Sequence, residues 1–273
     1  MKKKDRTWLQ TLVALLIIAL HITPFYIMVN MSLKELSDRS SRWMPALHPY
    51  FQNYPTAIEH GNLLSAMWNT WIIAFLSVII IVVAGAMAAY PLARKTSRRN
   101  RIILTLIVGV MMVPQLSILV PLYKEMVSLK GINHLWGIVI VSATFHLPMA
   151  IYMYSNFIKS IPKDLDEAAM IDGCSMMQSF FYVILPCLKS TTVSVIILNG
   201  VGIWNDYQFQ LYFLQKPAMR TITLAISTFF TDSKQDLGAA AAAAFIVVLP
   251  PVMAYIFLQK YFTEGIARAG LAN

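Results

Sequence analysis

Long uninterrupted runs of mostly apolar residues dominate this sequence, and each run is long enough to cross the hydrocarbon core of a bilayer as a helix, which takes about 20 residues. Six such runs can be distinguished, at residues 8–29, 66–93, 102–123, 135–157, 191–212 and 239–262. Strands of a membrane β-barrel would instead alternate apolar and polar residues over about ten positions. No such alternation occurs. The sequence therefore predicts an all-α membrane protein with six transmembrane helices.

The composition supports one membrane domain over residues 1–273. Only 13% of the side chains are charged, whereas soluble domains carry about 25%. The sequence contains no GxxxxGK[ST] loop for a nucleotide, no HExxH and no GxSxG, and the spacing of Cys174 and Cys187 matches no metal or redox motif. We therefore expect no enzyme, no catalytic residue, no metal site and no cofactor bound by this chain.

The distribution of lysine and arginine predicts the orientation, because positively charged loops tend to remain in the cytoplasm. With the N-terminus inside, the cytoplasmic segments hold 14 of the 22 Lys and Arg residues, and the segment "ARKTSRRNR" is the densest cluster. We expect both termini in the cytoplasm and a longest outer loop, about residues 30–65, that is ordered. The net charge of +9 is spread over several loops, which argues against nucleic-acid binding.

Few ionisable or polar side chains lie within the predicted spans. Ion-coupled secondary transporters need intramembrane carboxylates or broken helices for their ions, and this scarcity argues against that class. His21 and His146 are interpreted as helix-packing residues. The candidates for lining a polar pathway are Asn199, Trp204, Asn205 and Asp206. Alternatively, Asn205 and Asp206 lie at a span terminus that faces water, and Trp204 is an interfacial tryptophan.

The loop at residues 158–190 differs from the rest of the chain because acidic residues gather in it. Asp164, Asp166 and Glu167 follow Pro162, and acidic side chains after a proline favour the first turn of a helix. Gly173 is the expected end of this short helix. The sequence predicts a cytoplasmic helix of two to three turns, followed by a sharp turn.

A second helix is predicted directly after the glycine. Ser175 and Gln178 have the spacing of a capping box, and Pro186 is expected to bend this helix as it approaches the membrane. Such a hairpin could simply connect two spans. A DNA-reading helix-turn-helix is disfavoured because the segment is acidic and is tethered to the bilayer at both ends.

The sequence of this loop resembles the loop shared by permease subunits of binding-protein-dependent ABC importers. That loop has Glu-Ala-Ala, a glycine six positions after the glutamate, and a later Ile-x-Leu-Pro, with Val183 here in place of the isoleucine. The matching positions are Glu167, Ala168, Ala169, Gly173, Leu185 and Pro186.

Further stretches are similar to the carbohydrate-uptake branch of that family, and most of all to the smaller six-span permease of maltose-type transporters. They include "PLYKEMVSLKGINHLWGIVI", "WNDY", "LQKYFTEG" and the second span with Asn69 and Arg94. The tail "IARAGLAN" departs from the family's usual ending. The resemblance implies the type I importer permease fold, with the loop at 158–190 as a coupling-helix hairpin.

The resemblance also implies a function and partners. The chain would form half of a translocation pathway for a sugar or oligosaccharide, in a bacterial or archaeal cell membrane. It would assemble with a second permease, an extracytoplasmic solute-binding protein and two ATPases that use ATP and Mg²⁺, surrounded by membrane lipid. Glu167 would pair with a cation on the ATPase, Ala168 and Ala169 would allow close approach, and Gly173 would allow the sharp turn. The coupling site would also include Asp172, Leu185 and Pro186. Packing in the ATPase cleft or against the spans is expected of Met170, Ile171, Met176, Met177 and Phe180.

Three alternatives remain at the level of the sequence. The substrate could be another small polar solute carried by the same kind of importer. The chain could be an ion-coupled secondary transporter, although the scarcity of intramembrane carboxylates argues against it. It could also be a membrane scaffold or sensor that docks a cytosolic partner.

Overall fold

The computed structural model describes residues 4–231 and 236–270, without the side chains of 4–7, 231 and 261–270. These residues are mainly helical, and no strand occurs among them. The final residues of the tail, 271–273, lie outside this part of the chain. The chain divides into two compact units, Met1–Ser65 with Leu224–Pro250, and Ala66–Thr223 with Pro251–Asn273.

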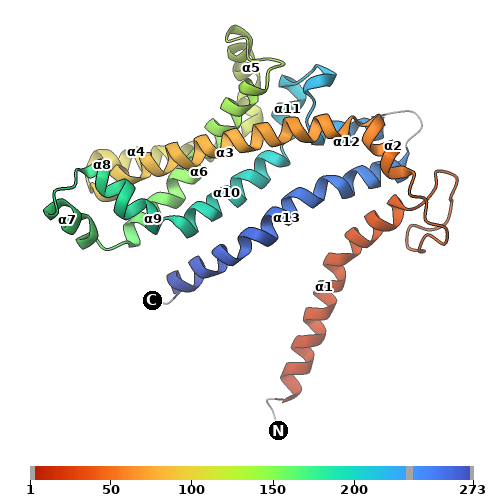
Figure 1. Ribbon diagram of the computed structural model, residues 1–273, viewed down its shortest axis with the longest axis horizontal. Coiled ribbons are helices and arrows are strands. Elements are labelled where there is room, and N and C mark those ends of the chain that lie inside the picture. The colour runs from red at the N-terminus through yellow and green to blue at the C-terminus, as the bar shows by residue number, and fades with distance from the viewer. Residues whose placement is uncertain (1–3, 232–235, 271–273) are drawn as a thin grey trace. The chain divides into compact units, whose positions relative to one another are not determined.

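The first unit contains the N-terminal helix and the loop that follows it (Figure 1). Its helices are α1 (Lys4–Ser32), α2 (Asn53–His60), the start of α3 (Leu63–Arg94), most of α12 (Ile222–Thr231) and the first part of α13 (Leu237–Gly270). No side chain of the apolar window in α1 is buried. A helix that is apolar all round and unburied needs lipid or another protein around it.

The loop between α1 and α2 is ordered by hydrogen bonds, as expected. Lys34 is only 2% exposed, and its ammonium group donates to Ser40 Oγ at 2.5 Å and to the carbonyl of Ser41 at 2.9 Å. Asn30 donates to the carbonyls of Arg42 and Met44. These side chains take up loop carbonyls that would otherwise lack partners, so the loop has one defined path.

The second unit holds the remaining helices. They are the rest of α3, α4 (Arg98–Val110), η1 (Gln115–Ile118), α5 (Leu119–Ser128), α6 (Leu135–Ser160), α7 (Asp164–Ile171), α8 (Met176–Ser179), the π-helix η2 (Phe180–Ile184), α9 (Leu185–Cys187), α10 (Lys189–Trp204), α11 (Gln208–Phe213), η3 (Pro217–Met219) and the end of α13. Within it, α6 packs against α4 and α10.

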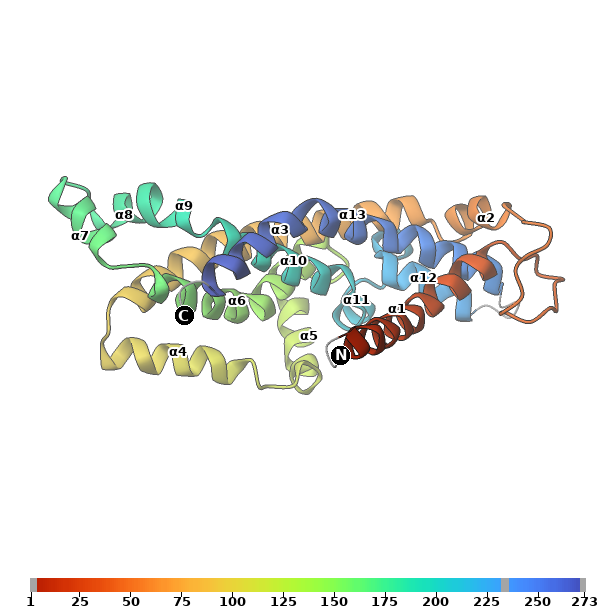
Figure 2. The ribbon, with the colours of Figure 1, turned by 90° about the horizontal axis from the view of Figure 1, so that it is seen from below.

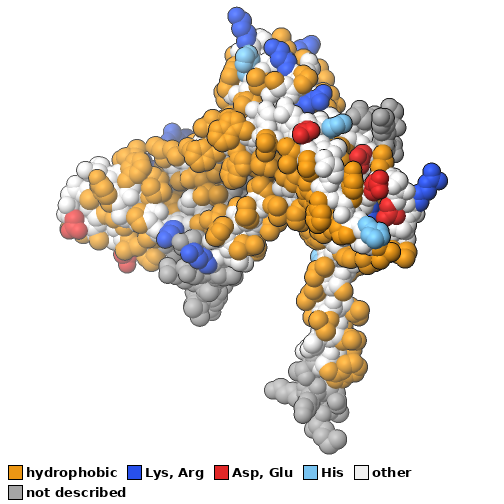
Figure 3. Space-filling model, turned by 45° about the vertical axis from the view of Figure 1, so that its right-hand side comes forward, with side chains coloured by type: hydrophobic (Ala, Val, Ile, Leu, Met, Phe, Trp, Pro, Cys, Tyr) orange, Lys and Arg blue, Asp and Glu red, His pale blue; other side chains and the backbone are white. Residues whose placement is uncertain are grey.

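Small residues bring these helices close together. A Cβ built on Gly85 of α3 would lie 3.1 Å from the Cβ of Ala150 on α6, so the two helices pack almost backbone to backbone, as small residues allow in membranes. Tyr154 is fully buried and donates to Thr192 Oγ1 of α10 at 3.1 Å. Hydrophobic side chains cover most of the face shown in Figure 3.

Within residues 4–231 and 236–270, four helices are long and apolar enough to cross a membrane, at Trp8–Ser32, Leu63–Arg94, Leu135–Ser160 and Leu237–Lys260. They correspond to four of the six predicted runs, and each helix extends beyond its run. The count reaches six when two bent helix pairs are each taken as one span.

The bent pairs correct two predicted boundaries. The run 102–123 is not one continuous helix, because the chain bends by 92° between Val110 and Gln115. Pro114 lies at this break and has no N–H to continue a helix. The run 191–212 is also interrupted, since α10 ends at Trp204 and α11 begins only at Gln208. A further bend of 74° separates α10 from the segment Met176–Cys187.

Candidate functional site

The acidic loop forms a helical hairpin at one end of the second unit, where α3 ends and α4 begins (Figure 2). Helix α7 has three acidic residues in its first turn, Asp164, Asp166 and Glu167. Their charges oppose the positive end of the helix dipole. The short first helix is therefore observed where the sequence predicts it.

The turn between the two helices follows the predicted residue pattern. Gly173 has φ = +88°, a conformation that L side chains rarely adopt. Ser175 then starts α8 with a complete capping box, in which its hydroxyl accepts from the Gln178 N–H and the Gln178 side chain accepts from the Ser175 N–H. Both ends of the turn are thus specified locally.

A buried ion pair fixes α7 to the end of α3. Nη2 of Arg94 lies 2.7 Å from Oδ2 of Asp166, with the two side chains only 9% and 8% exposed. At this separation the contact is a close ion pair between two side chains that are both largely shielded from water. Oδ1 of Asp166 accepts from the Tyr90 hydroxyl at 2.5 Å and from the Ser179 hydroxyl at 3.4 Å. A carboxylate in this position joins α3, α7 and α8.

The same arginine also holds the end of α6. Nη1 of Arg94 donates to the carbonyls of Ile158 and Ile161, at 3.0 and 2.8 Å. The last carbonyls of a helix lack partners within the helix, and here the guanidinium group donates hydrogen bonds to them. Tyr90 contributes a ring contact as well, with its centroid 5.2 Å from that of Phe180. Arg94 therefore ties the two membrane helices to the start of the hairpin.

The residues matched to the family loop divide between two faces of the hairpin. Glu167, Ala168, Asp172 and Gly173 are exposed, whereas Ala169 is buried. Further along, Leu185 is half-buried and Pro186 is exposed.

The apolar residues of the hairpin divide in the same way. Phe180 is buried against Tyr90, whereas Met170 and Met177 are exposed and Ile171 is 86% exposed; Met176 is half-buried. The outer face therefore combines an acidic side chain with exposed apolar ones.

A cavity of about 380 Å³ lies near the other end of α10. Asn205 and Asp206 line it, together with His146 of α6, whose Nδ1–H donates to the carbonyl of Ser142 at 2.9 Å. Gln208 and Phe209, which follow Asp206 in the chain, line the same cavity. The cavity also has aromatic walls, since Phe145 and Phe209 lie with ring centroids 4.7 Å apart.

The other two pathway candidates lie outside this cavity. Asn199 is buried and donates to the carbonyl of Val195 within its own helix at 2.7 Å. Trp204 is buried edge-on against Trp71, with ring centroids 5.5 Å apart. Nδ1–H of His21 donates to the Ile17 carbonyl at 2.7 Å. The structure brings Asn205 and Asp206 together with His146, and leaves Asn199 and Trp204 in the packing.

Sequence reasoning missed the ion pair that holds the hairpin. Asp166 was interpreted only as a helix-favouring acid, although it is buried and its neighbours Asp164 and Glu167 are exposed. The available signal was Arg94 at the end of the long apolar run of α3, since a charge in that position requires a partner. Nothing in the sequence indicated that the partner of Arg94 is Asp166, 72 residues further along the chain.

The fold defines a helical membrane protein whose acidic loop forms a short helical hairpin with exposed apolar side chains at one end of the second unit. Within this class, residues 81–268 match the family model described as the binding-protein-dependent transport system inner membrane component. The chain belongs to this family, and is therefore a transporter permease subunit and not an enzyme. No group of three or more His, Cys, Asp or Glu side chains in the described residues could hold a metal.

Relatives of known name cover nearly the whole chain. It is 38% identical over 258 residues to the melibiose/raffinose/stachyose import permease protein MelC of Bacillus subtilis, covering 94% of each chain. It is 32% identical to the probable starch degradation products transport system permease protein AmyC of Thermoanaerobacterium thermosulfurigenes, over 95% of this chain and 94% of the relative.

A solved structure has the same fold. A chain from a bacterial ABC transporter involved in the import of the acidic polysaccharide alginate superposes with a TM-score of 0.81 at 20% identity, over 96% of this chain and 99% of that chain. The likeness at this identity concerns the fold.

Proposed function

We propose that this chain is the permease subunit of an ATP-driven importer for a sugar or oligosaccharide. It forms half of the translocation pathway and is driven through the hairpin at residues 158–190. The single observation that carries the proposal is the hairpin itself, with its acidic and apolar outer face and its buried anchor to α3 and α6.

The anchor makes the hairpin suitable as a lever. A docked partner that pushes on α7 acts on Asp166, and through Arg94 on the ends of α3 and α6. A flexible loop would absorb such a movement, whereas a hairpin with buried hydrogen bonds and an ion pair transmits it. Glu167 lies on the outer face, where it can pair with a cation of the ATPase.

The substrate class is inferred from the relatives and the cavity. MelC and AmyC are named for oligosaccharide import and for starch degradation products. The cavity beside Asp206 combines polar groups with aromatic walls. Ligand sites of this kind use apolar surface for contact area and a few polar groups for orientation, which suits the ring faces and hydroxyls of a sugar.

The partners and the orientation complete the proposal. The chain works with a second permease, two ATPases that bind ATP and Mg²⁺, and an extracytoplasmic solute-binding protein. Both termini and the hairpin lie in the cytoplasm, in agreement with the basic cluster around Arg94. The chain lies in the cell membrane as one permease, and its pathway residues would be Asn205 and Asp206, which line the cavity, and not Asn199 and Trp204, which pack between helices.

The test uses Glu167→Lys in the assembled complex, with Asp164→Lys as the matched control. Both carboxylates are exposed in the first turn of α7, but only Glu167 belongs to the matched loop. We expect Glu167→Lys to lower sugar uptake and sugar-stimulated ATP hydrolysis at least tenfold at unchanged membrane insertion, and Asp164→Lys to retain both.

Uptake at the normal rate by Glu167→Lys would refute the coupling role. Gradient-driven uptake by the purified chain alone would instead support an ion-coupled transporter. Stimulation of ATP hydrolysis by a polar solute other than a sugar would leave the importer in place and change the substrate class.

A further inference from the structure

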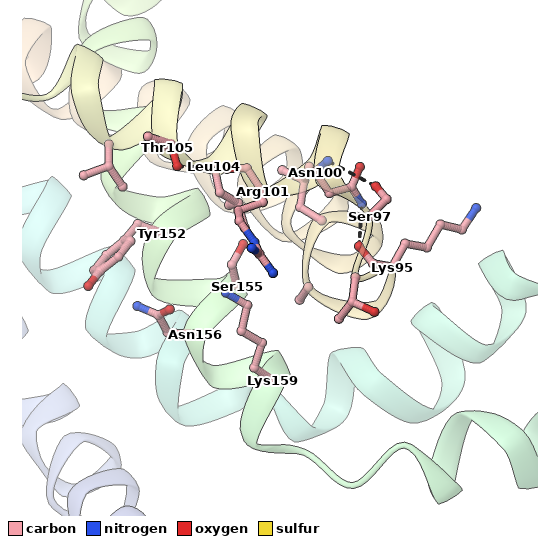
Figure 4. Close-up of a pocket in the computed structure, with 14 residues that line it drawn as sticks. Lys95, Ser97, Asn100, Arg101, Leu104, Thr105, Tyr152, Ser155, Asn156 and Lys159 are labelled. Atoms are coloured by element: carbon pink, nitrogen blue, oxygen red, sulfur yellow. Dashed lines mark hydrogen bonds between the residues drawn. The ribbon is translucent and has the colours of Figure 1, made fainter.

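A second cavity lies at the hairpin end of the second unit, between the α3–α4 corner and the last turns of α6 (Figure 4). Its volume is about 480 Å³. The corner is well built, because Asn100 is buried and its side chain donates to the carbonyls of Pro91 and Lys95, both at 2.9 Å. Ser97 caps α4 by accepting from the Asn100 N–H. The cavity therefore has a defined wall.

The polar half of the cavity is cationic. Arg101 extends from α4 and Lys159 from α6, and both point toward the same space beside Ser155, whereas Lys95 points away at the rim (Figure 4). No acidic residue lines the cavity, and neither Arg101 nor Lys159 forms an ion pair with any carboxylate of the described chain. Two converging cations without a counter-ion favour an anion between them.

Ser155 points to a ligand independently of the charges. Its side chain is 1% exposed, and its hydroxyl has no hydrogen-bond partner in residues 4–231 and 236–270. A serine inside a helix usually donates to the carbonyl four residues earlier. A buried hydroxyl without a partner is unfavourable, and an anion oxygen in this cavity could accept its hydrogen bond.

The other half of the cavity is apolar and follows α4 away from its charged start. Arg101, Leu104 and Val108 are spaced by three and four residues, so they share one face of the helix, and Tyr152 of α6 lines the same side. Val108 and Tyr152 are exposed. The charged group and the apolar groove therefore lie end to end, in the order of a headgroup and a hydrocarbon chain.

We propose that this cavity binds one anionic phospholipid, with its phosphate between Arg101, Lys159 and Ser155 and an acyl chain along Leu104, Val108 and Tyr152. Basic cavities between membrane helices at the cytoplasmic side suit such headgroups. A free phosphate would use the cations and leave the groove empty. The groove is what commits the site to a lipid.

The test measures binding of phosphatidylglycerol and phosphatidylcholine to the delipidated full chain in detergent, by native mass spectrometry. In Arg101→Gln/Lys159→Gln the affinity for phosphatidylglycerol should fall about 30-fold, because each cation near the surface contributes about a fivefold factor. The matched control is Arg98→Gln/Lys163→Gln, which removes one arginine and one lysine that are exposed but do not line the cavity. Its affinity should be unchanged.

A second variant tests the groove without altering charge. Val108→Trp fills the acyl path on an exposed face and should reduce phosphatidylglycerol binding at least fivefold. Phosphatidylcholine should bind at least tenfold more weakly than phosphatidylglycerol to the unmodified chain. Equal binding of both lipids, or equal losses in the two double variants, would overturn the proposal. If inorganic phosphate competes with phosphatidylglycerol at similar concentration, the cavity is a site for free anions. If a cross-linker placed at position 108 reacts with the partner permease in the assembled complex, protein covers the groove. Either result would refute a lipid site.

Discussion

The ion pair between Arg94 and Asp166 offers the sharpest test of how the hairpin is held. Asp166→Asn keeps the volume of the side chain and an oxygen to accept from the Tyr90 hydroxyl, but removes the charge. Arg94 would then be a buried cation with only the carbonyls of Ile158 and Ile161 as partners. Removing one partner of a buried pair costs about 3–5 kcal/mol.

The low exposure of both side chains, 8% and 9%, justifies the buried value over the smaller value for surface pairs. A cost of about 3 kcal/mol corresponds to a factor of more than 100 in an opening equilibrium. We therefore expect backbone amides of α7 and α8 to exchange hydrogen at least 100-fold faster in Asp166→Asn, while the buried middle of α6 remains protected.

Hydrogen exchange with mass spectrometry on the chain in lipid nanodiscs measures this directly. Glu167→Asn is the control, because it removes the adjacent carboxylate from an exposed position and should alter exchange less than fivefold. Replacing both partners with Arg94→Met/Asp166→Leu should recover part of the protection, since no unpaired charge remains. Unchanged exchange in Asp166→Asn, or equal effects of Asp166→Asn and Glu167→Asn, would refute the anchoring role.

Two further predictions concern the turn of the hairpin. Gly173→Ala should destabilise the hairpin by about 1 kcal/mol, seen as roughly fivefold faster exchange in α8, because φ is +88° although a Cβ there meets no atom within 4 Å; normal exchange would show that the turn relaxes freely. Ser175→Ala should cost about 1 kcal/mol through loss of the cap, with Ser175→Asp as the variant that retains it; equal losses in both would contradict the capping role.

Local signals in the sequence predicted the hairpin well. Proline, acidic residues, glycine and a Ser-x-x-Gln pair act over four residues or fewer, and the helix, the turn and the capping box occur where these signals lie. The long apolar runs also predicted four helices directly. Patterns of this kind suffice because helix geometry is decided within a turn or two.

Long-range contacts and helix breaks were outside the reach of those signals. The run 102–123 was predicted as one span, and its apolar composition gave no sign of the 92° bend near Pro114. Asn205 was named for its polarity, yet its place beside His146 depends on the packing of α6 against α10. The burial of Asp166 could not be predicted, because it depends on the end of α3 lying beside α7. A single sequence does not show that these two helices are neighbours.

The position of Arg94 suggests how movement is divided within the second unit. This residue bonds to the carbonyls that end α6 and to the acid that begins α7, so α3, α6 and α7 meet at one side chain. The other end of the hairpin reaches α10 through the π-helix η2 and a bend of 74°, and irregular turns of this kind are common where helices must adjust. A force on α7 should therefore move α3 and α6 together. The bend near Leu188 would allow α10 to move by a different amount.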